Sequence, residues 1–319
     1  MRAFIFPGQG SQAVGMGRAL ADASATARDV FGEVDEALGQ SLLRLMSDGP
    51  ADALQLTENA QPAIMANAVA TLRVLEREAG VRLADKADYV AGHSLGEYSA
   101  LCAAQALDLA TTARLLKLRG QAMQRAVAVG EGAMAALLGA NVELAGTIAG
   151  TAVDQILAEG GPELVCTVAN DNDPGQVVIS GHRAAVERAV ALAKGLGAKR
   201  GVILPVSAPF HCSLMEPAAR EMEAALADAD LRGPLVPVYV NVDAAPVADP
   251  GALRHLLVQQ VTGMVRWRES IERMVAEGVT DFVEFGGKVL GPMVKRIAPD
   301  ANAISVVSMD DIDGLVKAI

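Results

Sequence analysis

Short apolar runs and longer amphipathic stretches alternate along the first 125 or so residues. The runs Arg2–Phe6 and Tyr89–Ala91 predict buried strands. Helical periodicity predicts helices at Ala23–Leu45, Pro62–Ala79, Glu97–Ala106 and Leu109–Val127, with the polar stretch 57–61 as a connection before the second of them. Strands that alternate with helices in this way are typical of a layered α/β fold with a parallel sheet.

The pattern changes at Gly130–Gly132, after which strands and helices follow in the order β-α-β-β-α-β. Strands are predicted at Ala133–Leu138, Leu164–Ala169, Gln176–Ser180 and Arg200–Leu204, helices at Val142–Glu159 and Arg183–Gly195, and a turn at Asn170–Gly175. This order is that of ferredoxin-like modules. The α/β pattern resumes with strands at Val236–Val242 and Phe282–Glu284 and a helix at Gly251–Val261.

These patterns together predict the α/β class: an α/β-hydrolase-like core with a parallel sheet, plus an inserted ferredoxin-like small subdomain. We expect residues 1–130 and 205–319 to form the large α/β subdomain and residues 131–204 the small ferredoxin-like one. Two lobes leave a cleft between them, and clefts are where ligands bind.

Composition and charge exclude several classes of protein. Of the 319 residues, 51% are hydrophobic and 20% charged, which is enough for a globular protein with a large core. No apolar run approaches the ~20 residues of a membrane helix, and the N-terminus lacks the long apolar stretch of a signal peptide. The three cysteines form no CxxC pair, which favours a reduced, cytoplasmic protein without a metal site. A net charge of −11 argues against a nucleic-acid partner.

The segment Gly92–Gly96 fits the G-x-S-x-G pattern between a predicted strand and a predicted helix. A sharp strand-to-helix turn leaves no room for Cβ atoms beside the serine, so glycines are needed there. Such a turn exposes the hydroxyl of Ser94 and leaves the N–H of Leu95 at a helix N-terminus, where the dipole favours an oxyanion. The pattern alone is equally common in ordinary tight turns, and its position between strand and helix favours a nucleophile.

A serine nucleophile needs a base, and the chain offers four histidines. His93 adjoins the serine, so its ring is expected to point away from the hydroxyl. His182 falls at the predicted start of a helix in the small subdomain, and His255 lies within an amphipathic helix. His211 lies in a proline-bracketed loop, residues 205–212, and a rigid loop between two lobes suits a positioned base. Alone it is equally well explained as a loop histidine without a role; together with the turn at Ser94 it is the candidate base.

Two other segments carry candidate chemistry. Arg119 shares a predicted helix with Arg114 and Lys117, so the three form either a solvated face or, if Arg119 points inward, a bidentate carboxylate grip. The sequence leaves both open. In Phe6–Gln12, two glycines flank Gln9 and allow close backbone approach, so this loop is a candidate for a second N–H to an oxyanion. It lacks the Lys-Ser/Thr of a phosphate loop.

These segments, in this order, resemble the malonyl-CoA:acyl carrier protein transacylase family nearly from end to end. The segments that carry the resemblance are Phe6–Gln12, Gly92–Ala100, Leu118–Gly120 and Ala169–Gly181. The resemblance implies a ping-pong transfer in which Ser94 attacks the thioester of malonyl-CoA, His211 takes its proton, and the malonyl group passes to the phosphopantetheine thiol of a transiently bound acyl carrier protein. It implies a place in fatty acid synthesis and no permanently bound cofactor.

The resemblance also assigns the supporting residues. It implies that the backbone N–H groups of Gln9 and Leu95 hold the oxyanion, with Gln9 also at the substrate. Arg119 pairs with the malonyl carboxylate. The main-chain carbonyl of Gln260 orients the His211 ring, in place of the aspartate of a Ser-His-Asp triad.

The chain departs from the family pattern at two places. Met264 precedes Val265–Trp267 where the family usually has proline, and Gly286–Lys288 is one residue shorter than the usual Gly-Pro-Gly-Lys. Both sites are candidates for the rim of the cleft, where the carrier docks. An acidic protein would meet an acidic carrier through a local cationic patch, for which the candidates are Lys194, Lys199, Arg200, Lys288, Lys295 and Arg296. Each is equally well explained as plain solvated surface.

Two other functions remain as alternatives. A serine hydrolase or thioesterase of the α/β-hydrolase type would need an acidic residue between serine and histidine; Asp154 and Asp173 are present, but within the inserted segment. A non-catalytic carrier-binding module would have no need for Ser94, His211 and Arg119. Cys212, beside the base but on no sharp turn, is a remote candidate nucleophile.

Overall fold

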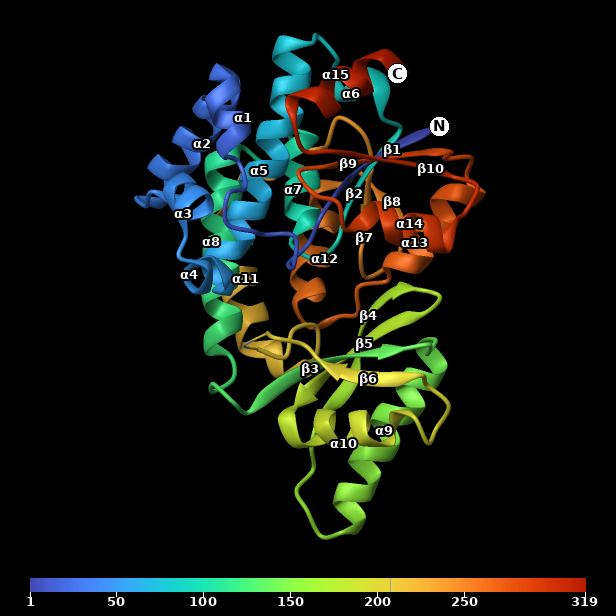
Figure 1. The fold of residues 1–319 in the computed structure, drawn as a ribbon. Coiled ribbons are helices and arrows are strands. Elements are labelled where there is room, and N and C mark those ends of the chain that lie inside the picture. Colours follow the sequence, from blue (N-terminus) through green and yellow to red (C-terminus); the bar gives the residue numbers. More distant parts are fainter. Residues whose placement is uncertain (207) are drawn as a thin grey trace.

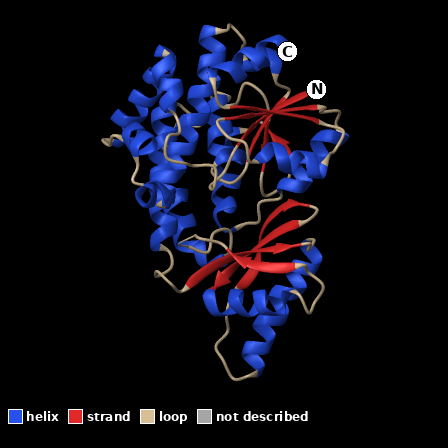
Figure 2. Ribbon diagram, in the orientation of Figure 1, coloured by secondary structure: helices blue, strands red, loops and turns tan. Residues whose placement is uncertain are grey.

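The strands of the computed structural model form two separate sheets, one of six strands and one of four, across residues 1–206 and 208–319, which the structure describes (Figure 1). Ser207, part of the predicted loop 205–212, lies outside the described residues. Helices pack around the larger sheet, and two helices lie on one face of the smaller one (Figure 2). The predicted α/β class with a largely parallel sheet is therefore confirmed.

The larger sheet has the strand order β10-β9-β1-β2-β7-β8. The strands are β1 (Arg2–Phe6), β2 (Tyr89–Gly92), β7 (Val238–Val240), β8 (Ala245–Val247), β9 (Asp281–Phe285) and β10 (Asn302–Val306). All neighbours pair in parallel except β7 and β8. The run of buried residues along β1 and β2 reflects helices on both faces of a parallel sheet. Phe6 lies opposite Gly92, so the segments after β1 and β2 leave the sheet side by side.

The helices that surround this sheet come from both ends of the chain. They are α1 (Arg18–Ala23), α2 (Ala25–Leu38), α3 (Leu42–Asp48), α4 (Ala51–Gln55), α5 (Thr57–Glu78), α6 (Leu83–Lys86), α7 (Gly96–Ala103), α8 (Leu109–Arg125), α11 (Glu216–Asp228), α12 (Pro250–Thr262), α13 (Trp267–Ala276), α14 (Leu290–Ile297) and α15 (Met309–Ala318), with a short 3-10 turn at Ser213–Met215. Buried residues of α2, α5, α7, α8 and α11 share one core with β1 and β2.

The smaller sheet is antiparallel, in the order β4-β5-β3-β6. Its elements are β3 (Gly132–Leu138), α9 (Val142–Ala158), β4 (Cys166–Asp173), β5 (Gln176–His182), α10 (Arg183–Ala193) and β6 (Arg200–Ile203), which follow the predicted β-α-β-β-α-β order. Successive side chains of β3 bury on opposite faces. Ala133, Ala135 and Leu137 pack with α9 and α10, whereas Met134 and Ala136 belong to the core of the larger sheet.

The far half of β4 joins the two sheets, and here the predicted turn at Asn170–Gly175 is too long, because only Pro174 and Gly175 form the turn. β4 continues to Asp173, where the Asp171 N–H donates to the Val265 carbonyl and the Val265 N–H donates to the Ala169 carbonyl, which makes a parallel bridge. The Asp171 carboxylate pairs with Arg268 on α13, and Asp173 pairs with Arg296 on α14. These polar residues resemble a turn in the sequence, but cationic partners far along the chain allow them to be buried in a strand.

Two helix predictions also need correction. The polar stretch 57–61 is the first part of α5 and not a connection, because its side chains bond to distant groups: Gln9 donates to Thr57, and Asn59 accepts from Lys117. The long helix predicted at Ala23–Leu45 is divided into α2 and α3, and α1 ends at Ala23. Ser24 caps the start of α2, and Gly39, with φ 59°, ends it.

No helix within residues 1–206 and 208–319 combines the length and the apolar character needed to cross a membrane.

Candidate active site

Three segments that follow neighbouring strands of the larger sheet meet at its carboxyl edge. The loop after β1 carries Gln9, the turn after β2 carries Ser94, and Asn241 follows β7 directly. In parallel sheets this edge is where ligands bind. The strand order therefore brings together residues that are more than 200 positions apart in the sequence.

The turn at Ser94 is a sharp and strained connection between β2 and α7. Ser94 has a φ of 53°, which costs a non-glycine residue on the order of 1 kcal/mol or more. A Cβ on Gly92 would lie 1.9 Å from the backbone of Gly96, and one on Gly96 would lie 2.3 Å from the Phe6 carbonyl oxygen. The Asn241 side chain holds the turn, since its Oδ1 accepts from the Ser94 N–H at 2.7 Å. The predicted need for both glycines thus has a direct steric cause.

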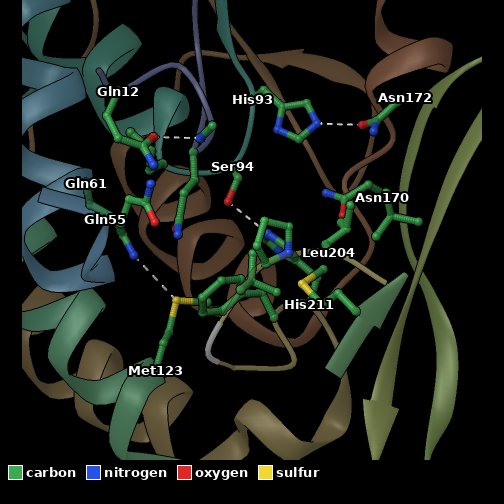
Figure 3. A pocket seen from close by; sticks show the side chains of 18 of the residues that line it. Gln12, Gln55, Gln61, His93, Ser94, Met123, Asn170, Asn172, Leu204 and His211 are labelled. Atoms are coloured by element: carbon green, nitrogen blue, oxygen red, sulfur yellow. Dashed lines mark hydrogen bonds between the residues drawn. The ribbon is translucent and has the colours of Figure 1, made fainter. Parts of the chain in front are cut away.

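His211 meets the serine across the pocket, as Figure 3 shows. The Ser94 Oγ lies 2.8 Å from His211 Nε2. On the other side of the ring, Nδ1 lies 2.9 Å from the Gln260 carbonyl oxygen and 3.1 Å from that of Gly263. Carbonyls only accept hydrogen bonds, so Nδ1 carries the proton and Nε2 is free to accept the one on the serine. The contact with Gly263 was not predicted.

The ring of His211 is held neutral by its surroundings. Burial lowers its pKa to about 3, and the positive charge of Arg119 acts in the same direction, while the two carbonyls oppose them. His211 is only 4% exposed. A buried imidazole without a carboxylate partner accepts a proton only when negative charge develops beside it.

Arg119 points inward, which decides between the two readings that the sequence left open. Its side chain is 1% exposed, while that of Arg114 on the same helix is exposed. Nη1 donates to Gln61 Oε1 at 2.8 Å, and Nη2 donates to Gln260 Oε1 at 2.9 Å and to the Ser94 hydroxyl at 3.2 Å. Burial lowers the pKa of the guanidinium. A buried cation held only by neutral groups, next to the nucleophile, is suited to an anionic substrate group.

A cavity of ≈ 410 Å³ opens above these groups, within the size range of small-molecule sites. Gln9, Leu95, Met123 and Asn170 are among its lining residues. Among the described residues, neither the Gln9 nor the Leu95 N–H has a hydrogen-bond partner. Both backbone donors are thus available at the wall of the cavity that holds Ser94.

Comparisons with known proteins agree with this geometry. The family model described as "Acyl transferase domain" matches residues 3–287. A protein of Bacillus subtilis (strain 168), named malonyl CoA-acyl carrier protein transacylase, is 42% identical over 318 residues, which are 99% of this chain and 96% of that protein. The chain belongs to the malonyl-CoA:acyl carrier protein transacylase family.

Solved structures of this transacylase family have the same fold. The crystal structure of an acyl-carrier-protein S-malonyltransferase from Bartonella henselae matches with a TM-score of 0.94 and 50% identity, covering 99% of this chain and 98% of that one. A second transacylase, solved in complex with its type II polyketide acyl carrier protein, matches with a TM-score of 0.93 and 38% identity over 100% of this chain and 99% of that one.

The other candidate nucleophile and bases make no contact with the Ser94 hydroxyl in the described structure of this transacylase-family chain. His93 Nε2 bonds to Asn172 Oδ1 at 2.8 Å, pointing away from the Ser94 hydroxyl as predicted (Figure 3). His182 is at the N-terminal end of α10, and His255 is exposed on α12. The Cys212 thiol donates to the Pro209 carbonyl, and burial raises its pKa, so it is no nucleophile in this arrangement.

The acidic residues that a hydrolase triad would require are also accounted for. Asp154 is exposed on α9, and Asp173 pairs with Arg296. Neither bonds to His211, whose Nδ1 faces two carbonyls. The transacylase arrangement is therefore favoured over the hydrolase.

Four residues of the site escaped the sequence reasoning: Gln61, Glu97, Asn241 and the Gln260 side chain. Gln61 stood in a stretch taken for a connection, and Asn241 followed a strand without any motif. Glu97 directly follows the last glycine of the turn, and an acidic residue in an otherwise apolar helix was a signal that this position is special.

Neither departure from the family pattern lines the cavity above Ser94. Met264 adjoins Val265, which pairs with β4, and Gly286–Lys288 line a separate hollow beside residues 10–20. No group of His, Cys, Asp or Glu side chains in residues 1–206 and 208–319 is arranged to hold a metal ion.

Proposed function

We propose that this chain transfers a malonyl group from malonyl-CoA to the phosphopantetheine thiol of an acyl carrier protein, through a seryl ester on Ser94. One observation carries the proposal: the Ser94 hydroxyl lies 2.8 Å from the imidazole of His211 and 3.2 Å from a buried guanidinium that bonds to no carboxylate in the described part of the chain. A nucleophile beside an anion-binding cation suits a short acyl group with a free carboxylate.

In the first half-reaction, Ser94 Oγ attacks the thioester carbonyl carbon while His211 Nε2 takes its proton. The N–H groups of Gln9 and Leu95 receive the oxyanion. The imidazolium then returns the proton to the departing CoA sulfur, and the tetrahedral intermediate collapses to malonyl-Ser94. The carbonyl oxygens of Gln260 and Gly263 keep the ring in position throughout.

In the second half-reaction, the carrier thiol gives its proton to His211 and attacks the seryl ester. Collapse expels Ser94 Oγ, which regains the proton from the imidazolium. A thioester and a seryl ester are close in free energy, so the site must chiefly keep water from the intermediate until the second thiol arrives. Release of malonyl-CoA's acyl group to water in the absence of carrier would instead indicate a hydrolase.

The assignment of Arg119 is tested by its removal. Arg119→Ala should lower kcat/KM for malonyl-CoA by about a hundredfold or more, since a buried ion pair with the substrate is lost. Acylation by acetyl-CoA, which has no carboxylate, should fall much less. The measurement is single-turnover formation of acyl-Ser94 by mass spectrometry, with Ser94→Ala as the blank. Equal losses for both donors would refute the carboxylate grip.

We also propose the finer division of the fold: an α/β-hydrolase-like large subdomain of residues 1–130 and 205–319, and a ferredoxin-like subdomain of residues 131–204. The β-α-β-β-α-β order and the strand order β6-β3-β5-β4 support the second part. A cytoplasmic location is proposed on the three free, buried cysteines.

A further inference from the structure

Glu97 is a buried carboxylate beneath the nucleophile that the mechanism above does not use. It lies in the first turn of α7, directly after the turn of Ser94, and is 0% exposed. Its Oε2 accepts from the Asn241 N–H and from Gln260 Nε2, both at 2.9 Å. Its Oε1 has no hydrogen-bond partner among the described residues. Burying a carboxylate costs free energy that hydrogen bonds only partly offset, and here one of the two oxygens makes them all. Such a residue suggests a role beyond packing.

Gln260 connects this carboxylate to the guanidinium. A carboxylate only accepts hydrogen bonds and a guanidinium only donates them. The Gln260 amide satisfies both in one orientation alone, with Nε2 toward Glu97 and the Ser94 carbonyl, and Oε1 toward Arg119 Nη2. The acceptors at Glu97 and at the Ser94 carbonyl therefore fix together which end of the amide faces Arg119.

The charges around Glu97 agree with this arrangement. Burial raises the pKa of Glu97 to about 7, and its bonds to Asn241 and Gln260 and the charge of Arg119 oppose the rise. The negative charge of Asp243, which follows β7, acts in the same direction as burial and raises the pKa of Glu97. A proton on Glu97 would sit on the unpartnered Oε1, so Oε2 stays an acceptor in either protonation state.

We propose that Glu97 is a positioning residue for malonyl recognition, which acts through the Gln260 amide to hold the Arg119 guanidinium beside Ser94. The inference rests on the function proposed above. Without an acceptor at position 97, the Gln260 NH2 group keeps the Ser94 carbonyl at 3.0 Å but loses its buried carboxylate partner, so the amide that accepts from Arg119 is held less firmly. The guanidinium is then no longer held beside Ser94. Acylation by malonyl-CoA, which has a free carboxylate, should slow more than acylation by acetyl-CoA, which has none.

Two substitutions distinguish the hydrogen-bond acceptor at position 97 from the volume of the side chain there. Glu97→Gln keeps an oxygen where Oε2 accepts and puts its NH2 where Oε1 has no partner. Glu97→Met fills similar volume and accepts nothing comparable. We expect the ratio of kcat/KM for malonyl-CoA to that for acetyl-CoA to fall about tenfold or more in Glu97→Met, and to stay within about threefold of the parent in Glu97→Gln.

Glu284→Gln is the matched control. Glu284 is another wholly buried carboxylate, but it caps α14 by accepting from the N–H groups of Val289, Leu290 and Gly291. It should lower the thermal midpoint without changing the donor ratio. A purely structural role for Glu97 would likewise slow both donors in parallel, and that result in Glu97→Met would overturn the proposal.

A double-mutant cycle with Arg119→Ala distinguishes this inference from the function beneath it. Because Glu97 acts through Arg119, adding Glu97→Met to Arg119→Ala should leave the donor ratio where Arg119→Ala alone puts it. If Arg119→Ala keeps the malonyl preference, the carboxylate grip proposed for Arg119 is wrong. If Arg119→Ala loses it and Glu97→Met does not, only the role of Glu97 is wrong. Should Glu97→Met not fold, Glu97→Asp replaces it, since its carboxylate is withdrawn from Gln260 by one methylene; an unchanged ratio there has the same meaning.

Discussion

Ser94 and His211 both adopt backbone conformations that non-glycine residues rarely occupy, with φ of 53° and 59°. Strain of this kind persists only where neighbours hold it. Asn241 holds the backbone of Ser94, and the carbonyls of Gln260 and Gly263 hold the ring of His211. The pair is therefore positioned before any substrate arrives, and burial, assisted by the charge of Arg119, lowers the pKa of the imidazole.

The pH profile should reveal that influence. Burial and Arg119 both depress the His211 pKa, to about 3, so the base stays neutral well below pH 6. An ordinary imidazole of pKa ~6.5 would be about 3% neutral at pH 5. We expect kcat/KM for acetyl-CoA, which reports the free enzyme, to fall far less between pH 7 and 5 than the ~25-fold that such an imidazole would give.

The same measurement on Arg119→Ala gives the sign of the effect. Removing the cation removes one cause of the depressed pKa, so the acid limb should move to higher pH. If the acid side of the pH profile stays in place or moves to lower pH, the charge of Arg119 does not lower the pKa of His211.

At the scale of elements, the turn between β2 and α7 is packed too closely for a Cβ at Gly92 or Gly96. Gly8, in the loop after β1, is also packed against it, since a Cβ there would lie 2.7 Å from the His93 carbonyl oxygen. The end of β1 with its following loop, the turn after β2 and the start of α7 thus touch through their backbones, without side chains between them. The close approach brings the loop of Gln9 to the same wall as Leu95.

Gly96→Ala should therefore damage both stability and activity. The added Cβ would meet the Phe6 carbonyl oxygen at 2.3 Å and push α7 away from β1. We expect a loss of about 1–3 kcal/mol in the free energy of unfolding and a larger proportional loss of Ser94 acylation, measured by denaturant unfolding and single-turnover assay.

Gly146→Ala is the control. Gly146 lies within α9, and a Cβ there meets nothing within 4 Å. It should be neutral or stabilising by up to ~1 kcal/mol. A Gly96→Ala protein that matched this control would contradict the steric account of the turn.

Sequence patterns predicted the elements whose physics is local and missed those that depend on distant partners. The turn at Ser94 followed from glycine spacing, and β3, α9 and β5 followed from periodicity. Residues 57–61 and 170–173 were misjudged because Thr57, Asn59, Asp171 and Asp173 are polar, and only the fold supplies their partners. The carbonyl of Gln260 came from family resemblance alone, because no side-chain pattern marks a main-chain oxygen.

At the scale of the whole molecule, two ion pairs and a strand bridge join the sheets. Asp171 and Asp173 are buried, and their partners Arg268 and Arg296 come from the larger part. Two of the six candidate cations for the carrier-docking patch already have partners, since Arg296 pairs with Asp173 and Lys295 donates to the Pro299 carbonyl. The candidates that remain for this patch are Lys194, Lys199, Arg200 and Lys288. The same strand presents Asn170 and Asn172 to the cavity.

Asp171→Asn should loosen this junction. It removes the charge that Arg268 meets and leaves a weaker hydrogen bond, so we expect a loss of about 1–2 kcal/mol in the free energy of unfolding. Hydrogen exchange should increase along residues 166–182, and acylation by both donors should slow together. Glu159→Gln, which breaks the exposed ion pair with Arg188, should leave the free energy of unfolding, the hydrogen exchange and the acylation rates unchanged. Exchange confined to other segments would argue against the junction.

The two-sided burial of β3 also bears on how such proteins are re-engineered. Met134, Ala136 and Val178 face the core of the larger sheet rather than α9 and α10. Excising residues 131–204, or exchanging them for those of a relative, would strip one wall from that core and expose apolar surface to water. A chimaera intended to accept different acyl groups therefore has to exchange Met134, Ala136 and Val178 together with the side chains they touch across the seam, or it will aggregate before its specificity can be measured.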